Sequence, residues 1–126
     1  MVKLVPVLGT LVWVGAVAQI ILGFQVAADI EAYRGIHILI GIVGFALVAG
    51  LAVIAFRSKS ATIYSKLIIV ILTVVVLLQV GMGFQLLGEA ESLVTPHEVN
   101  AFLIVILSLV MGGVTFMSAK KHNPGT

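Results

Sequence analysis

The sequence contains no cysteine, and only 10% of its 126 residues are charged. Without cysteine the chain cannot form a disulfide, ligate an iron–sulfur cluster through thiolates, attach a c-type haem or carry a redox-active dithiol. A Ser–His–acid set, a phosphate-binding glycine loop and a metalloprotease motif are also missing. The sequence also has no row of charged residues of the kind that lines a transporter pathway. Thiol chemistry and these hydrolytic, nucleotide-binding and transport patterns are therefore excluded.

What the sequence has instead is apolar residues, which make up 61% of the chain and give it a mean hydropathy of +1.27. A soluble domain of this size could not cover so much apolar surface. Four apolar runs, at residues 4–26, 36–56, 67–87 and 99–118, approach the roughly 20 residues that a helix needs to span a bilayer. The sequence therefore predicts an all-α integral membrane protein: a four-helix up-down-up-down bundle that forms a single transmembrane domain over residues 1–126.

An internal repeat becomes visible when the chain is shifted by 60 residues against itself. Polar and small residues then align without a gap: Gln19 with Gln79, Gly23 with Gly83, Phe24 with Phe84, Gln25 with Gln85, and His37 with His97. The first repeat covers about residues 4–58 and the second about 64–118. The bundle is thus expected to have an internal two-fold repeat, in which each repeat contributes two consecutive helices.

The N-terminus also resembles a signal peptide, because Lys3 precedes an apolar stretch and residues 16–18 read Ala-Val-Ala. The apolar run nevertheless continues past Ala18 and through Gln19 to Gln25, a segment that belongs to the repeat. We therefore expect this first segment to be a retained helix.

Charged residues of opposite sign are separated along the chain. The N-terminal segment, the central loop and the C-terminal tail carry the basic residues Lys3, Arg57, Lys59, Lys66, Lys120 and Lys121. The other two loops and their borders carry all five acids, Asp29, Glu31, Glu89, Glu91 and Glu98, with the single base Arg34. The positive-inside rule predicts a multi-pass protein of the cell membrane with both termini cytoplasmic and the acidic loops outside. The basic residues act as membrane anchors, so we expect the lipid bilayer as a partner and no nucleic acid.

His37 and His97 are the candidate metal ligands. Thr95, Pro96 and Glu98 have the pattern of an N-cap, a first-turn proline and a capping box, which places His97 in the first turn of the fourth helix. His37 occupies the matching point of the second helix, and these two helices are parallel and diagonally opposite in such a bundle. We therefore expect the imidazoles to face each other near the outer surface and to hold one haem iron.

Two other interpretations of the histidines stay open. A zinc site would need carboxylates, with Glu31, Glu91 or Glu98 as candidates. Alternatively, the pair is interfacial and has no ligand role. The third histidine, His122, lies beside lysines in the polar tail and is expected to be solvated.

Small residues near the histidines predict space for a flat cofactor. Gly41 and Gly44 follow His37 by four and seven residues and share its helical face. Gly23 and Gly83 occupy matching positions in the first and third helices. Close helix–helix packing is the alternative role for such glycines in a membrane.

Four glutamines interrupt the apolar pattern of the first and third helices. Gln25 and Gln85 lie nearer the outer end, and each is a candidate either to donate a hydrogen bond to a histidine or ligand or to join two helices. Gln19 and Gln79 are expected to join helices only.

Arg34 precedes His37 by three residues and has no basic counterpart in the second repeat. Its guanidinium is suited to bind a haem propionate. A surface ion pair with Asp29 or Glu31 is the alternative.

The sequence QVGMGFQ at residues 79–85, followed by His97, and the matching residues 19–25, followed by His37, resemble one half of the haem A synthase family. Full-length members of that family fuse two four-helix bundles, and histidines of the second and fourth helices of each bundle hold one haem. The resemblance extends over nearly all of the chain. It implies haem as the cofactor and His37 and His97 as its ligands.

Two features depart from the family pattern. The family places a glutamate, thought to help oxidation of a haem methyl group, three residues before the first histidine, where this sequence has Arg34. The nearest acid is Glu31, which is thus a candidate catalytic residue. The first outer loop is also shorter than in the family and has no cysteine. Haem binding is therefore better supported than catalysis.

The leading hypothesis is a membrane b-type cytochrome that binds one haem by bis-histidine ligation near the outer face, because six-coordinate iron suits electron transfer. Its partner would be a quinol or a larger respiratory complex, and a homo-oligomer is compatible with the sequence. Two alternatives stay open: a half-size haem A synthase-like enzyme that oxidises a haem methyl group, and a non-redox accessory subunit of a membrane complex.

Overall fold

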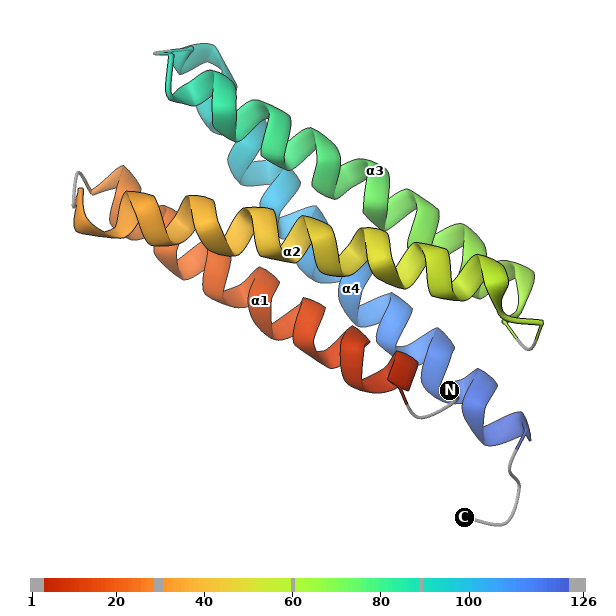
Figure 1. Cartoon of the computed structure of the whole chain (residues 1–126). Coiled ribbons are helices and arrows are strands. Elements are labelled where there is room, and N and C mark those ends of the chain that lie inside the picture. The colour runs from red at the N-terminus through yellow and green to blue at the C-terminus, as the bar shows by residue number, and fades with distance from the viewer. Residues whose placement is uncertain (1–3, 29–30, 60, 89, 123–126) are drawn as a thin grey trace.

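The computed structural model describes the backbone of residues 4–28, 31–59, 61–88 and 90–122, with their side chains except at 4–6, 115–116 and 118–122. The chain forms four long helices (Figure 1): α1 (Leu4–Ala27), α2 (Ala32–Arg57), α3 (Ile63–Leu86) and α4 (Val94–His122). A short 3-10 turn, η1 (Glu91–Leu93), precedes α4. All four helices are long and apolar enough to cross a membrane. The prediction of an all-α, four-helix membrane bundle is confirmed.

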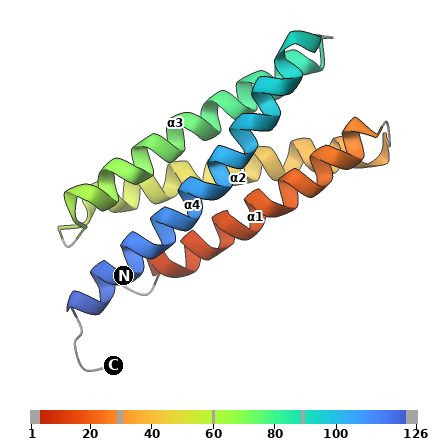
Figure 2. The same ribbon diagram turned by 180° about the vertical axis from the view of Figure 1, so that it is seen from behind.

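The four helices pack around a square. Each helix packs against the next along the chain, and α4 packs against α1 to close the square. Successive helices run in opposite directions, so α2 and α4 are parallel and diagonally opposite (Figures 1 and 2). Each sequence repeat is therefore one antiparallel hairpin, α1–α2 for the first hairpin and α3–α4 for the second.

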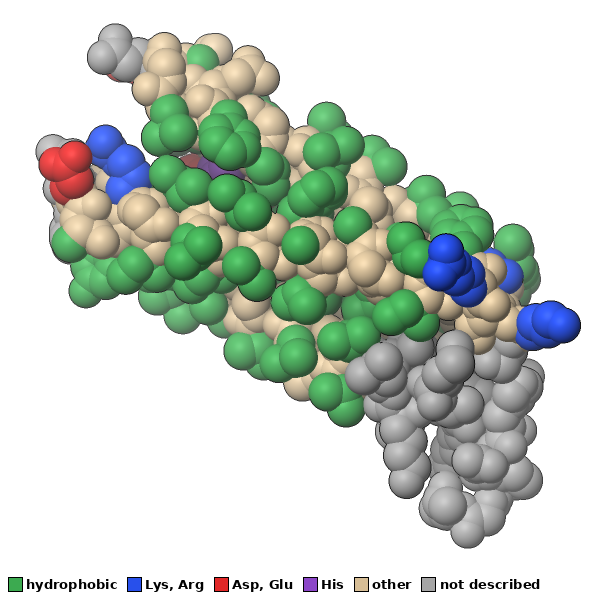
Figure 3. All heavy atoms as spheres, in the orientation of Figure 1, with side chains coloured by type: hydrophobic (Ala, Val, Ile, Leu, Met, Phe, Trp, Pro, Cys, Tyr) green, Lys and Arg blue, Asp and Glu red, His purple; other side chains and the backbone are tan. Residues whose placement is uncertain are grey.

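The two ends of the bundle differ in charge (Figure 3). We call one the basic end, because Arg57, Lys59 and Lys66 lie at the α2–α3 connection there. The other, the acidic end, has the α1–α2 and α3–α4 connections with Glu31, Glu91 and Glu98 beside them. Outside the described residues lie Asp29, Glu89, Lys3 and the side chains of Lys120, Lys121 and His122.

The helices extend beyond the apolar runs that predicted them. α3 begins at Ile63, where the Thr62 side chain caps it by accepting a hydrogen bond from the Ser65 backbone N–H at 3.2 Å. α4 begins at Val94, after the η1 turn, so Thr95 lies inside the helix and the prediction that it is the N-cap is wrong. An apolar run marks only the part of a helix that crosses hydrocarbon, whereas the helix itself continues to the next cap or turn.

The buried core extends from the basic half to about the middle of the bundle. It joins residues from every helix: Val12, Val48, Leu51, Ala55, Ile69, Leu72, Val76, Ile104 and Met111. Between Val12, Val48, Val76 or Ile104 and the acidic end, no residue that the structure describes is buried. The acidic half is therefore loosely packed, and Figure 3 shows an opening between the ends of the two hairpins, in which a histidine side chain is visible.

This distribution predicts which leucines hold the bundle together. Leu72 is fully buried, whereas Leu77, on the same helix, is 53% exposed. Leu72→Ala should lower the free energy of unfolding by roughly 2–4 kcal/mol, because it leaves a cavity in the packed half. Leu77→Ala is the matched control and should change it little. Unfolding by a denaturing detergent, followed by circular dichroism, measures both; equal losses would contradict the assigned core.

Candidate functional site

The structure brings the rings of His37 and His97 together from diagonally opposite helices. Their ring centroids are 6.2 Å apart and their planes are inclined by 64°. Both residues are half-buried and lie near the acidic end, in the second turn of α2 and the first turn of α4. The two equivalent positions of the repeat thus form one site between the two hairpins.

Gly23 and Gly83, which the sequence suggested as space for a cofactor, lie against the histidine rings. A methyl group at Gly23 would lie 3.5 Å from Cε1 of His37, and one at Gly83 would lie 3.3 Å from Cε1 of His97. Each ring therefore lies against the backbone of the other helix in its own hairpin. Gly41 is also covered, by the Gln19 amide, and Gly44 alone of the four has no atom near an added methyl group.

In the first hairpin, the side chain of Gln19 joins α1 to α2 without bonding to the imidazole. Its Nε2 donates to the backbone carbonyl of His37 at 2.9 Å. The amide can reach that carbonyl because Gly41 has no side chain: a methyl group there would lie 2.7 Å from Gln19 Nε2. The Oε1 atom of Gln19 is buried and has no hydrogen-bond partner among the described residues.

In the second hairpin, the equivalent glutamine contacts the imidazole itself. Nε2 of Gln79 lies 3.1 Å from Nε2 of His97. Asn100, one turn further along α4, donates from Nδ2 both to Gln79 Oε1 at 2.7 Å and to the Val75 carbonyl at 3.0 Å. The prediction that Gln79 only joins helices therefore missed its contact with the candidate ligand.

The separation of the two ring centroids matches that of two imidazoles on one metal, although Nε2 of His97 is turned to Gln79. A metal midway between two imidazoles would lie about 3.1 Å from each ring centroid, since its bond to nitrogen is about 2.0 Å and the centroid is about 1.1 Å further. With both bonding nitrogens turned toward the metal, the centroids would be about 6.2 Å apart, which is also the observed separation. The inclination of 64° is no obstacle, because each ring can rotate about its bond to the metal. In addition, Nδ1 of both histidines is buried without a partner in the described structure.

Carboxylates do not complete this site. Within the described residues, no group of three or more His, Cys, Asp or Glu side chains could hold a metal ion. Glu31 lies 3.8 Å from the Arg34 guanidinium, and both side chains are largely exposed. This weak ion pair is the alternative that the sequence offered for Arg34. Two imidazoles without carboxylates suit haem iron, whose porphyrin supplies the other ligands, better than zinc.

The side chains of Gln25 and Gln85, the expected donors near the histidines, bond to no imidazole within the described part of the chain; Gln25 is half-buried and Gln85 is exposed. The contact with an imidazole instead comes from Gln79, supported by Asn100. One sequence signal pointed to this arrangement. Asn100 is an amide one turn after His97, where the first repeat has the apolar Ile40.

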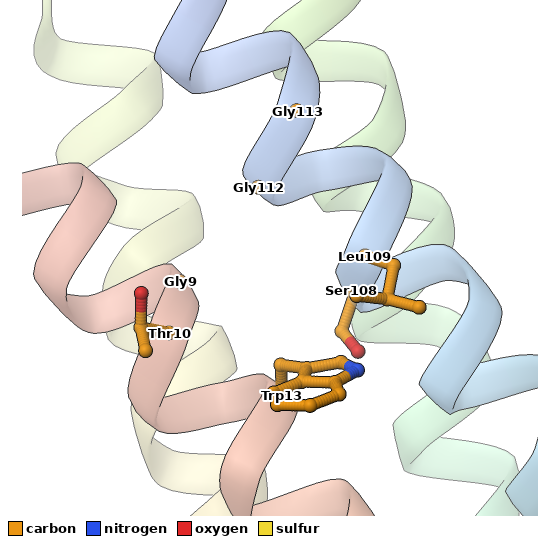
Figure 4. A pocket seen from close by; sticks show the side chains of 7 residues that line it. All are labelled: Gly9, Thr10, Trp13, Ser108, Leu109, Gly112 and Gly113. Atoms are coloured by element: carbon orange, nitrogen blue, oxygen red, sulfur yellow. The ribbon is translucent and has the colours of Figure 1, made fainter.

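A separate cavity of about 220 Å³ lies between α1 and α4 in the basic half (Figure 4). Its lining residues are Gly9, Thr10, Trp13, Ser108, Leu109, Gly112 and Gly113. The buried indole nitrogen of Trp13 points toward Ser108, whose hydroxyl donates to the Val105 carbonyl at 2.8 Å. Ser108 follows His97 by 11 residues, or about 16 Å of helix. The cavity is therefore distinct from the histidine site.

The contact between Gln19 and Gly41 leads to a prediction about stability. Gly41→Ala should push the Gln19 amide off the His37 carbonyl, whereas Gly44→Ala meets open space. Both changes improve helix propensity, so the comparison isolates the lost bond. The Gly41 variant should be less stable than the Gly44 variant by about 1 kcal/mol. Unfolding in detergent measures the difference; equal stability would show that the bond contributes nothing.

Comparison of the chain with models of known protein families, with curated proteins and with solved structures gives no match. The resemblance to haem A synthases therefore stays a prediction from the repeated glutamine and histidine segments. The function has to be inferred from the geometry of the histidine pair.

Proposed function

We propose that this chain is a small membrane b-type cytochrome that binds one haem between His37 and His97 and transfers electrons. The observation that carries the proposal is the 6.2 Å separation of the two rings, which come from equivalent positions of an internal repeat. An edge-to-face contact of two rings has a similar separation, so the equivalence of the two positions in the repeat is what favours a shared metal. The same proposal accounts for the repeated glutamine–histidine segments that resemble haem A synthases.

The packing of the bundle supports the same site. The basic half holds the hairpins together through its buried core, and the acidic half is open, with no buried residue among those that the structure describes there. A flat macrocycle needs such an opening between two parallel helices. Haem would supply one-electron redox chemistry, while His37 and His97 would hold it and the apolar helices would limit its contact with water. Arg34, at the mouth of the site, would bind a propionate through its exposed guanidinium.

Bis-histidine ligation favours electron transfer over oxygen binding, because both axial positions are filled. The electron partner is then a membrane quinol or a larger respiratory complex. For catalysis on a haem methyl group, Glu31 is the only acid that the sequence offers near the position of the family's glutamate. Its carboxylate is exposed and faces Arg34, so no observation favours the enzymatic alternative.

The absorption spectrum tests haem binding. Purified in a mild detergent from a bacterial host supplied with a haem precursor, the protein should show a Soret band and a sharp α-band on reduction. The double variant His37→Ala with His97→Ala should lose this low-spin spectrum, because it lacks both axial nitrogens. The matched control is His122→Ala, which removes the remaining histidine of the chain and should leave the spectrum unchanged.

Each other outcome has a distinct meaning. A wild-type protein without haem, or a double variant with the wild-type spectrum, would contradict the proposal and favour an accessory subunit. Extraction of the pigment into alkaline pyridine identifies the porphyrin. Haem A in that extract, after co-expression with a source of haem O, would favour the synthase-like enzyme instead.

We also propose that the acidic end faces the outside of the cell, since the basic residues Arg57, Lys59 and Lys66 gather at the opposite end. The absence of cysteine makes this testable, because a single introduced thiol is then unique. Ser92→Cys, near the acidic end, should react with a membrane-impermeant maleimide in intact cells. Ala61→Cys, in the α2–α3 connection, should react only after the cells are permeabilised. The reverse pattern would invert the orientation.

A further inference from the structure

The two halves of the candidate site differ in one respect that the repeat does not predict. Gln19 bonds to the backbone of His37, whereas the equivalent Gln79 bonds to the ring of His97. Two sequence differences explain this. Gly41 leaves room for the Gln19 amide, but Ala101 carries a methyl group at the equivalent place. Asn100, which replaces the apolar Ile40 of the first repeat, offers Gln79 a donor.

The direction of these hydrogen bonds is fixed by a backbone carbonyl. The Val75 oxygen can only accept, so the Asn100 atom that faces it at 3.0 Å must be the NH₂ nitrogen. That nitrogen uses its second hydrogen on Gln79, whose facing atom must therefore be the oxygen. The Gln79 NH₂ group then faces His97 and donates to Nε2. We call this chain of bonds, from Val75 through Asn100 and Gln79 to His97, the amide relay.

The amide relay determines which nitrogen of the neutral His97 ring is protonated. Because Nε2 accepts a hydrogen bond, the proton of the neutral ring is on Nδ1. The lone pair of Nε2 is thus committed to Gln79 and cannot bind iron at the same time. The Gln19 side chain makes no corresponding bond to the ring of His37, because its amide donates to the His37 carbonyl. Iron binding by His97 through Nε2 therefore requires an exchange of hydrogen bonds that binding by His37 does not.

We propose that Gln79 and Asn100 are positioning residues that make His97 the weaker, exchangeable axial ligand and leave His37 as the resident one. A small external ligand of iron then competes for the place of His97. This inference rests on the proposed haem site and adds a regulated ligand position to it. Gln79 competes with iron for Nε2 of His97. The strength of its hydrogen bond therefore determines how readily an external ligand replaces His97 on the iron.

Carbon monoxide is a suitable probe, because it binds reduced haem where an axial ligand has left. Gln79→Leu removes the competitor for Nε2, so His97 should hold iron more tightly and the affinity for carbon monoxide should fall about fivefold, the factor that one hydrogen bond supplies. Asn100→Ile, which copies the first repeat, should act in the same direction with a smaller effect. Gln19→Leu is the matched control at the equivalent position and should leave the affinity within about twofold. Titration of the reduced protein, followed at the Soret band, gives all four affinities.

A second measurement tests the relay without haem. Labelling with ¹⁵N-histidine gives a simple spectrum, because the chain has three histidines. In protein prepared without haem, the ring nitrogens of His97 should have the shifts of the tautomer protonated on Nδ1. Gln79→Leu should move them, and Gln19→Leu should not.

The outcomes separate the two proposals. A haem-bound wild type in which Gln79→Leu and Gln19→Leu have equal affinity for carbon monoxide would overturn the exchangeable ligand and leave the cytochrome standing. A His97 ring protonated on Nε2 would overturn the relay by itself. A wild type that binds no haem would overturn both proposals, whatever the ring shifts are.

Discussion

Inside a bilayer a side-chain amide or imidazole has no water to bond to, so its position is decided by whichever neighbouring helix offers a partner. In this bundle the partners of the polar side chains near the histidines lie within one hairpin. Gln19 bonds across α1 and α2, and Gln79 and Asn100 bond across α3 and α4. Between the hairpins, contact in the basic half comes from the apolar core, and near the acidic end the rings of His37 and His97 approach each other. Each hairpin is therefore a unit with its own polar bonds, and the candidate site lies where the two units meet with the least packing.

The internal repeat explains why the site exists, and its imperfections explain how the site differs from a symmetric one. Two copies of a helical hairpin, related by a two-fold axis, bring equivalent residues together near that axis. This places two histidines opposite each other without any further requirement. Symmetry then breaks at neighbouring positions of α2 and α4: Gly41 against Ala101, and Ile40 against Asn100. A methyl group at Ala101 and the amide of Asn100 change which atom of the histidine the glutamine meets.

Much of the fold could be predicted from the sequence, because apolar runs and a gapless repeat are signals on the scale of whole helices. The four helices, their order and the meeting of His37 with His97 follow from those signals. The contacts of the glutamines did not follow, since they depend on space of the size of one methyl group beside Gly41 and Ala101. For the same reason the contacts of Gly23 and Gly83 with the histidine rings did not follow from the sequence. The predicted start of α4 was wrong, because Thr95 and Pro96 fit the pattern of an N-cap and a first turn. In the structure the η1 turn leads directly into α4, which begins at Val94.

The division into a packed basic half and an open acidic half also determines how precisely the ring separation is held. Leu51, Leu72 and Met111 are almost fully buried, so the angle between the hairpins is set by interlocking side chains in that half. The histidines lie beyond this core, His97 seven residues before Ile104 and His37 eleven before Val48, where no described residue is buried. A small change in the crossing of the hairpins at the core is therefore enlarged at the rings, as at the open end of a hinge. A group bound between the rings would oppose that movement from the other end, so that core packing and ligand binding would together fix the geometry of one site.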